Sequence, residues 1–438
     1  MERIDTLIHA RWVVPIEPSA TILEHHAVAV RDGRIVAVLP SVDAETHYSA
    51  ERSVHRDQHA LLPGLVNAHT HLAMSLLRGL ADDLPLERWL GENIWPAEAR
   101  WVSHDFVRDG AELALAECIR GGVTCVNDMY FFPDATARAA LDAGLRASLG
   151  LVVLDLPTAW AAGAEECLHK GLAVRDAHAN DALLSFMFAP HAPYSVGDAS
   201  FERLRVLAAE LETRIHCHVH ETATEVATAV AKDGRRPLAR LDALGVLGPD
   251  LLAVHMTQLT DAEVALCAER GVTVAHCPRS NLKLASGECR VADLQAAGVS
   301  VALGTDGAAS NNDLDMFGEM RSAALLAKAV AQDPTVLPAH AALRMATLDG
   351  ARALGLGDAI GSISPGKWAD LIAVDLGGLE QQPVYDAAST LVYATGRERV
   401  TDSWVAGQAL MRDRALLTLD EAALVARAGE WRTRIRPA

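Results

Sequence analysis

The sequence predicts an α/β protein, a (β/α)₈ TIM-like barrel with a small β-sandwich built from both chain ends. Short apolar strands alternate with helix-length segments between residues 61 and 306, whereas both ends of the chain have the pattern of β-hairpins. Alternating strands and helices imply a parallel sheet, and eight such repeats fit a closed barrel. We therefore expect residues 1–60 and 363–438 to form the sandwich, the latter with a C-terminal helix, and residues 61–362 to form the barrel and its C-terminal helices.

Hairpin signals mark both ends of the chain. His26–Val30 and Arg34–Leu39 flank Asp32-Gly33, and an Asp-Gly pair between two apolar runs favours a tight turn. Near the other end, Ala369–Asp375 is an apolar strand, and Ala406-Gly407 separates two further short runs. These runs are Ser403–Val405 and Gln408–Met411.

Eight strands are predicted for the barrel: Leu61–Ala68, Val123–Asn127, Leu145–Val153, Leu183–Ala189, Arg214–Val219, Leu251–His255, Val272–His276 and Val299–Gly304. Helical patterns separate most of them: Asp105–Arg120, Asp134–Ala143, Ala199–Glu212 and Asp261–Glu269. Two more helices, near Asp315–Val330 and Thr335–Leu354, lead back to the terminal strands. An open doubly wound sheet would need a glycine-rich phosphate loop after the first strand, and Asn67-Ala-His-Thr-His71 stands there instead.

Composition excludes several classes of partner. The chain has 438 residues, with 39 Lys and Arg against 57 Asp and Glu, which gives a net charge of −18. Such an acidic protein is not expected to bind nucleic acid or an anionic membrane. No apolar run has the roughly 20 residues that cross a bilayer, and the N-terminal residues do not have the pattern of a signal peptide. The seven cysteines form no C-x-x-C pair, so we expect a soluble, cytoplasmic enzyme.

Histidines gather at the ends of predicted strands, where barrel enzymes carry their functional groups. They are His69, His71, His191, His216, His218, His220, His255 and His276. His69 and His71 are two residues apart on one strand and face the same side, so we expect them to bind a divalent metal, with zinc favoured. The alternative is a pair of hydrogen-bonded core histidines.

The fifth strand offers three alternating histidines, of which one or two can reach a single metal. We choose His218 as the ligand, because Glu221 can then enter the mouth of the barrel. His216 is expected deeper in the core, and His220 in loop packing. Asp306, after the eighth strand, can complete three histidine ligands and leave a position open for water, as in catalytic zinc sites. Glu221 is then placed to move protons between that water and a substrate nitrogen.

Four segments together resemble the amidohydrolase superfamily: Pro63–His71, His218–Glu221, His276–Asn281 and Thr305-Asp306. The resemblance covers nearly the whole chain. Within the superfamily the sequence most resembles the 5′-methylthioadenosine/S-adenosylhomocysteine deaminases. The more specific marks are Trp89, Pro96-Ala-Glu98, Ala189–Ser195 and Ser280–Gly287.

The resemblance implies one zinc ion bound by His69, His71, His218 and Asp306. No lysine lies at the end of the fourth predicted strand, where two-metal relatives carry a bridging carbamylated lysine, so a single metal is favoured. His255 would orient the nucleophilic water, Glu221 would protonate N1 of the purine, and Asp306 would take a proton from the nucleophile.

For the substrate, the resemblance implies that Glu98 accepts hydrogen bonds from the ribose hydroxyls and that His191 contacts the nucleoside. Trp89 would stack on or close over the sugar or base. Relatives that accept S-adenosylhomocysteine tend to offer arginines to the carboxylate of its tail, and Arg146 is the one candidate for that role here. The segment Asp155–Trp160 offers no other arginine.

The leading hypothesis is therefore a zinc-dependent hydrolytic deaminase of adenine nucleosides that releases the inosine analogue and ammonia. Methylthioadenosine and adenosine are favoured as substrates over S-adenosylhomocysteine. The alternatives are the same site acting on a triazine, guanine or pterin, and a non-catalytic barrel that serves as a binding module. The expected partner is a small-molecule nucleoside, and the sequence leaves open whether the chain forms a homo-oligomer.

Overall fold

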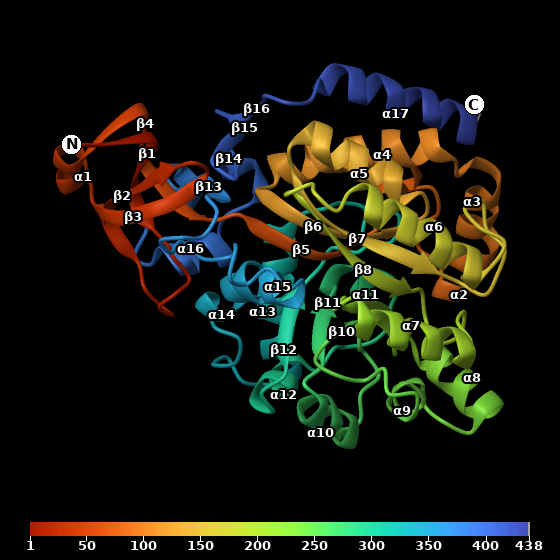
Figure 1. The fold of residues 1–438 in the computed structure, drawn as a ribbon. Helices are drawn as coiled ribbons and strands as arrows, with labels where there is room; N and C mark the ends of the chain where they lie inside the picture. The colour runs from red at the N-terminus through yellow and green to blue at the C-terminus, as the bar shows by residue number, and fades with distance from the viewer. Residues whose placement is uncertain (437–438) are drawn as a thin grey trace.

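The computed structural model describes residues 1–436 and contains a parallel barrel beside a separate sheet (Figure 1). The barrel strands lie in the order β12-β11-β10-β9-β8-β7-β6-β5, and each neighbouring pair is parallel. Their bounds are β5 Leu65–Thr70, β6 Val123–Tyr130, β7 Arg146–Val153, β8 Leu184–Pro190, β9 Ile215–Val219, β10 Leu251–His255, β11 Thr273–His276 and β12 Ser300–Leu303. All eight predicted strands are present.

Side-chain and main-chain bonds close the barrel between its first and last strands. The Asp306 N–H donates to the His69 carbonyl at 3.0 Å, and the Thr305 N–H donates to Asn67 Oδ1 at 2.9 Å. The predicted first strand, Leu61–Ala68, is divided at Gly64, whose N–H donates to the Asp370 carbonyl. A Cβ at Gly64 would lie 2.0 Å from Thr124 Oγ1, so the crossing from one sheet to the other requires glycine.

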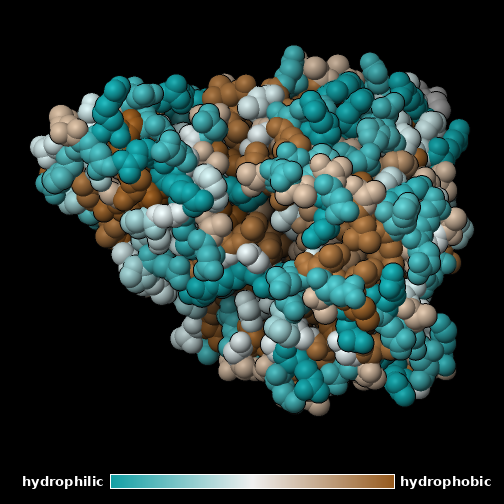
Figure 2. Space-filling view, in the orientation of Figure 1, coloured by the Kyte–Doolittle hydropathy of each residue, from teal (hydrophilic) through white to brown (hydrophobic). Residues whose placement is uncertain are grey.

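Helices surround the barrel strands. Five predicted helices are confirmed within two residues: α4 His104–Arg120, α5 Pro133–Ala143, α7 Asp198–Glu210, α10 Asp261–Arg270 and α13 Met316–Ala331. The structure adds helices that were not predicted: α6 Ala164–Ala177, α8 Ala223–Asp233, α9 Pro237–Ala243, α11 Pro278–Lys283 and α12 Val291–Ala296. Thr260 begins α10 with a complete capping box, and Ser103 caps α4. In Figure 2 the outer surfaces are mainly hydrophilic, and apolar side chains gather in the hollows between elements.

The predicted helix Thr335–Leu354 is wrong as a single element. It consists of α14 Ala339–Met345 and α15 Leu348–Ala353. Pro338 delays the start, since proline is favoured at a helix N-terminus and not inside one. Thr347 interrupts the chain because its hydroxyl donates to the Leu343 carbonyl at 2.6 Å and its backbone leaves the helical region.

Strands from both chain ends form one eight-stranded sheet in the order β16-β15-β14-β13-β4-β1-β2-β3. The bounds are β1 Glu2–Val13, β2 Leu23–Arg31, β3 Arg34–Pro40, β4 Tyr48–Pro63, β13 Leu371–Asp375, β14 Val400–Val405, β15 Gln408–Arg412 and β16 Ala415–Leu416. The remaining helices of this region are α1 Ser41–His47, α16 Ala387–Tyr393 and α17 Glu421–Ile435, with short 3₁₀ turns at Leu379–Gln381 and Arg397–Arg399. The expectation of a separate β unit from both ends is thus confirmed, and its strands are hydrogen-bonded into a continuous sheet.

Both predicted hairpins turn where the sequence indicates. Asp32 and Gly33 have φ values of 50° and 73°, and Ala406 and Gly407 have φ values of 47° and 75°. Two successive residues with positive φ give the turn type whose twist matches that of paired strands. The tips of the two hairpins meet, because a Cβ on Gly33 would lie 2.5 Å from the Ala406 carbonyl oxygen.

The prediction that Arg146 binds the carboxylate of a substrate tail is wrong. It is the first residue of β7 and therefore lies at the opposite end of the barrel from the functional strand ends. Its Nε and Nη2 atoms donate to Asp370 at 2.9 and 3.2 Å, and both side chains are buried. Asp370 also accepts from the Ala406 N–H at 2.8 Å. Arg146 therefore joins the barrel to the terminal sheet and does not reach a substrate tail.

Removing one member of this pair should destabilise the fold. We expect Arg146→Ala to lower the free energy of unfolding by about 3–5 kcal/mol, because it leaves the Asp370 carboxylate buried without its partner. Urea unfolding followed by circular dichroism measures the change. The matched control is Arg138→Ala, which breaks an exposed pair with Asp142 and should cost about 0–1 kcal/mol. An Arg146→Ala protein with unchanged stability and a selective defect on a carboxylate-bearing substrate would contradict this assignment.

Candidate active site

A cavity of about 350 Å³ opens at the C-terminal ends of the barrel strands. Its floor carries His71, His218, His255 and Asp306, which come from four different strand ends. Part of its wall comes from the segment after β5, which holds a 3₁₀ turn Leu72–Leu77, α2 Leu86–Arg88, a π-helical turn Trp89–Ile94 and α3 Trp95–Trp101. The loops after β6, β7 and β8 supply other parts. The volume suits a small organic molecule, and most of the lining side chains are apolar.

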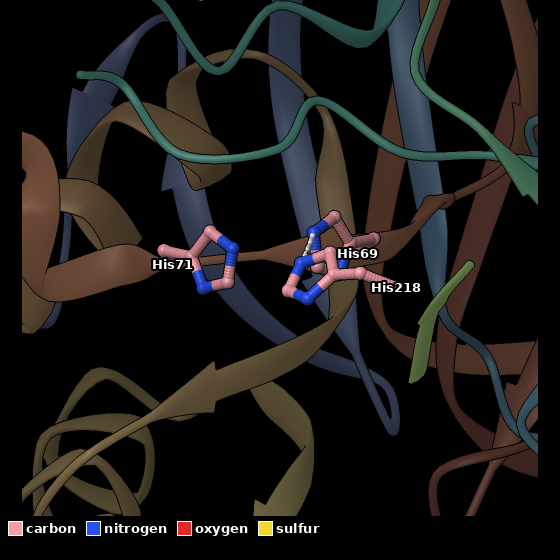
Figure 3. A group of neighbouring side chains, drawn as sticks. All are labelled: His69, His71 and His218. Carbon is pink, nitrogen blue, oxygen red and sulfur yellow. Dashed lines mark hydrogen bonds between the residues drawn. The ribbon is translucent and has the colours of Figure 1, made fainter. Parts of the chain in front are cut away.

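Three histidines converge on the floor of the cavity (Figure 3). His71 Nδ1 donates to the Met129 carbonyl at 2.6 Å, and His218 Nδ1 donates to the His191 carbonyl at 2.7 Å. A carbonyl oxygen only accepts, so both rings carry their proton on Nδ1 and, when neutral, leave Nε2 as a bare lone pair. His69 Nε2 lies 3.2 Å from His218 Nε2, in the same cluster.

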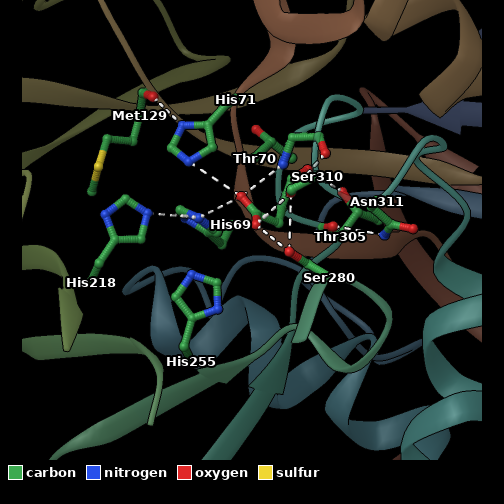
Figure 4. Close-up of polar contacts among 12 residues, drawn as sticks. His69, Thr70, His71, Met129, His218, His255, Ser280, Thr305, Ser310 and Asn311 are labelled. Carbon is green, nitrogen blue, oxygen red and sulfur yellow. Dashed lines mark hydrogen bonds and ion pairs between the residues drawn. The ribbon is translucent and has the colours of Figure 1, made fainter. Parts of the chain in front are cut away.

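Asp306 turns one carboxylate oxygen toward these histidines, within the network of polar contacts drawn around His69 and His71 in Figure 4. Its Oδ1 lies 3.3 Å from Nε2 of both His69 and His71. Its Oδ2 accepts hydrogen bonds from the hydroxyls of Ser280 and Ser310 at 2.6 and 2.7 Å. The serines fix the carboxylate so that Oδ1 points into the cluster.

The four ligand atoms fit a divalent cation. In the neutral rings, Nε2 of His71 and His218 is an acceptor, as is Asp306 Oδ1. His218 Nε2 and Asp306 Oδ1 lie 3.2 and 3.3 Å from His69 Nε2, and the ligand atoms of the three histidines all lie within 4.8 Å of one another. A single proton on His69 cannot satisfy three acceptors, whereas a metal ion can accept an electron pair from each of them. Imidazole with carboxylate is the ligand set that zinc favours.

His255 and Glu221 lie beside this cluster. His255 Nδ1 donates to Asn281 Oδ1 at 2.8 Å, so its Nε2 faces the cavity, 3.8 Å from Glu221 Oε1. Burial raises the pKa of Glu221, which favours the protonated carboxyl group. Glu225 holds the turn in place, since its carboxylate accepts from the backbone N–H groups of His220 and Glu221.

His216 on β9 and His220, which directly follows β9, have the places expected for them. His216 is fully buried, and its Nε2 lies 2.9 Å from His69 Nδ1. This hydrogen bond orients the His69 ring from the side opposite the cluster. His220 Nε2 accepts from the Leu238 N–H at 3.1 Å and packs at the start of α9. Neither lines the cavity.

The cavity wall brings together Trp89, Glu98 and His191. Glu98 Oε1 accepts from the Tyr130 hydroxyl at 2.7 Å; burial raises the pKa of Glu98, and this hydrogen bond opposes the rise. Burial, with a smaller contribution from His71, lowers the pKa of His191 to about 4, so its ring is neutral near pH 7. Ser195 Oγ, 2.8 Å from His191 Nδ1, orients that ring.

Comparison with known proteins places this arrangement in a family. The model of the amidohydrolase family matches residues 60–410. A 5-methylthioadenosine/S-adenosylhomocysteine deaminase of Teredinibacter turnerae is 47% identical over 99% of this chain and 98% of its own length. A second protein of that name, from Saccharophagus degradans, is 46% identical over 99% of this chain and 97% of its own length.

The chain belongs to the amidohydrolase family. Membership makes it a hydrolase that acts on carbon–nitrogen bonds, as the resemblance of its motifs implies. A crystal structure of an adenosine deaminase from Xanthomonas campestris with bound zinc aligns with a TM-score of 0.98 and 58% identity, covering all of both chains. An atrazine chlorohydrolase from Arthrobacter aurescens shares the fold, with a TM-score of 0.90 and 24% identity over 97% of this chain and 99% of its own.

The amidohydrolase site contains supporting residues to which the sequence alone gave no role. They are Tyr130 beside Glu98, Asn281 beside His255, and Ser280 and Ser310 on Asp306. The sequence held a signal for two of them, because Ser280 and Asn281 belong to the family motif His276–Asn281, which begins at the end of β11. Tyr130 ends β6 at the same face of the barrel, which is the position of the candidate ligands on other strands.

Metal content tests the ligand cluster in this amidohydrolase. We expect one zinc ion per chain to stay in the barrel through dialysis and to be lost in His71→Ala, since removing one of four ligands weakens binding strongly. Elemental analysis of the purified proteins measures the difference. His220→Ala, a buried histidine that does not line the cavity, is the control that should retain the ion. Retention of the barrel ion by His71→Ala would show that the ligands are other residues.

Proposed function

We propose that this amidohydrolase is a zinc-dependent hydrolytic deaminase of adenine nucleosides. Its substrates would be 5′-methylthioadenosine and adenosine, and its products the inosine analogue and ammonia. The observation that carries the proposal is the position of the buried Glu221 carboxyl group in the same cavity as the ligand cluster and 3.8 Å from His255. The names of the similar proteins support the same activity.

The metal site would consist of His69, His71, His218 and Asp306. When bound there, a zinc ion supplies Lewis-acid chemistry: it lowers the pKa of water toward neutrality and stabilises negative charge that develops in the reaction. One site of this kind is sufficient for the reaction.

Three side chains of the protein would move and orient protons. Glu221, whose pKa is raised by burial, would donate a proton to N1 of the adenine ring and so make C6 more electrophilic. His255, held by Asn281, orients the attacking water through Nε2. Asp306 Oδ1 would accept one proton from the water as the water oxygen bonds to C6, and would pass that proton to the amino group. The C6–N bond then breaks and ammonia leaves, while the remaining proton on the C6 oxygen returns to Glu221 as the carbonyl forms.

The cavity wall would hold the nucleoside. Glu98 accepts hydrogen bonds from the two hydroxyl groups of the ribose, because a carboxylate offers several acceptor positions to a vicinal diol. His191, neutral near pH 7, forms a hydrogen bond with the nucleoside. Trp89 is almost fully buried and offers its ring to the sugar or base as part of the apolar wall.

Glu221→Gln tests the proton transfer. We expect kcat to fall by about 10²–10⁴-fold, because the amide cannot donate and recover the proton. The bound metal should stay, because Glu221 is not among the proposed ligands. Ammonia release and the absorbance change of adenosine measure the rate, and elemental analysis measures the metal. Glu210→Gln, on the exposed face of α7, is the control. Near-normal turnover in Glu221→Gln would remove Glu221 from this role.

The lining of the cavity predicts substrate preference. The charged residues in it are Glu98, Glu221 and Asp306, and it contains no lysine or arginine. The carboxylate of S-adenosylhomocysteine would find no cationic partner there, since Arg146 lies at the other end of the barrel. A lost charge-assisted hydrogen bond costs about 1.5–3 kcal/mol.

We therefore expect kcat/KM to be about ten- to a hundredfold lower for S-adenosylhomocysteine than for 5′-methylthioadenosine. Parallel assays of both substrates and adenosine on one enzyme preparation measure the ratio. Guanine and a triazine in the same panel test the alternative that this site acts on another heterocycle. Equal or greater efficiency on S-adenosylhomocysteine would overturn the prediction.

A further inference from the structure

The terminal sheet carries a second group of metal-ligating side chains, in a different unit from the barrel site. Ligand atoms of His9, Glu45 and His55 all lie within 4.8 Å of one another. His9 is on β1, His55 is on β4 and Glu45 is on α1, so three separate elements contribute (Figure 1). Nothing in the proposed deaminase chemistry uses these residues.

Strand pairing places the two histidines next to each other. β1 and β4 are parallel neighbours, and His9 lies directly opposite His55 in their register. The two imidazole rings stack, with centroids 4.4 Å apart and planes 5° apart. The pairing of β1 with β4 therefore fixes this arrangement.

His9 also has an unsatisfied polar atom. The residue is only 4% exposed, and its Nε2 is buried with no hydrogen-bond partner among the described residues. Leaving a buried polar nitrogen unpaired is unfavourable by about 1–3 kcal/mol. A cation bound between His9, His55 and Glu45 would satisfy it.

We infer that His9, His55 and Glu45 form a second binding site for a divalent transition-metal ion, with zinc the best match to two imidazoles and a carboxylate. His55 and Glu45 are exposed, so their side chains have room to turn toward an ion beside the fixed His9. Water completes the coordination on the open side.

Such an ion would fasten α1 to the sheet. This helix has seven residues, no side-chain cap at its N-terminus, and one buried residue, Ala44. Helices of this length are unstable by themselves and need contacts with the rest of the protein. A metal ion that joins Glu45 on α1 to His9 and His55 on the strands supplies such a contact. The proposed role of this site is therefore structural.

Zinc stoichiometry tests the inference. The full-length protein, with the barrel ion in place, is incubated with zinc, dialysed and analysed for metal and melting temperature. We expect two zinc ions per chain in the wild type and one in His55→Ala and in Glu45→Gln. Both substitutions are at exposed positions, so the fold is retained. His47→Ala, another exposed residue of α1, is the matched control and should keep two ions.

The second ion should raise the melting temperature of the wild type and of His47→Ala and leave that of His55→Ala unchanged. Deaminase activity should be the same in all four proteins, which separates this site from the barrel site. The His71→Ala protein should in turn lose the barrel ion and keep this one. A wild type with a single zinc ion, or two ions retained by His55→Ala, would overturn the inference.

Discussion

Two hydrogen bonds from imidazole rings to backbone carbonyls fix the orientation of two histidines at the floor of the cavity, and the candidate metal site depends on both. His71 donates to Met129 and His218 donates to His191, and each bond fixes the proton on Nδ1. When the rings are neutral, each bond leaves Nε2 as a lone pair, near Asp306 for His71 and near His69 for His218. Met129 is on β6 and His191 directly follows β8, so the barrel strands set these tautomers and form a site that suits a cation.

Barrel closure and site formation depend on the same residues. The Asp306 N–H donates to the His69 carbonyl and so joins the last strand to the first, while the Asp306 carboxylate faces the histidines. Asp306 and His255 have φ values of 63° and 73°, a conformation that costs a non-glycine residue roughly 1–3 kcal/mol. The hydrogen bonds around them hold this strained backbone, which turns both side chains into the cavity.

The sequence predicted which histidines converge at the strand ends, and its prediction that Arg146 binds a substrate tail was wrong, for a physical reason. A spacing of two along a strand places His69 and His71 on one face wherever the strand starts. The prediction that Arg146 binds the carboxylate of a substrate tail rests on its charge, and charge does not indicate at which end of a strand a residue lies. Gly144 ends α5 in a left-handed conformation just before it, so Arg146 opens β7 at the far side of the barrel. Supporting partners such as Tyr130 depend on distances between elements, which no local pattern encodes.

The fold alone does not identify the substrate, because an atrazine chlorohydrolase has nearly the same fold as this chain. The candidate cation cluster and the cavity wall around it are built from different elements. The barrel strand ends supply the cation cluster, whereas Trp89 and Glu98 come from the helical insertion after β5. A carboxylate in an otherwise apolar wall favours a neutral ligand that donates hydrogen bonds, and it disfavours an anion. The net charge of −18 acts in the same direction at longer range, so both the surface and the cavity disfavour an anionic ligand.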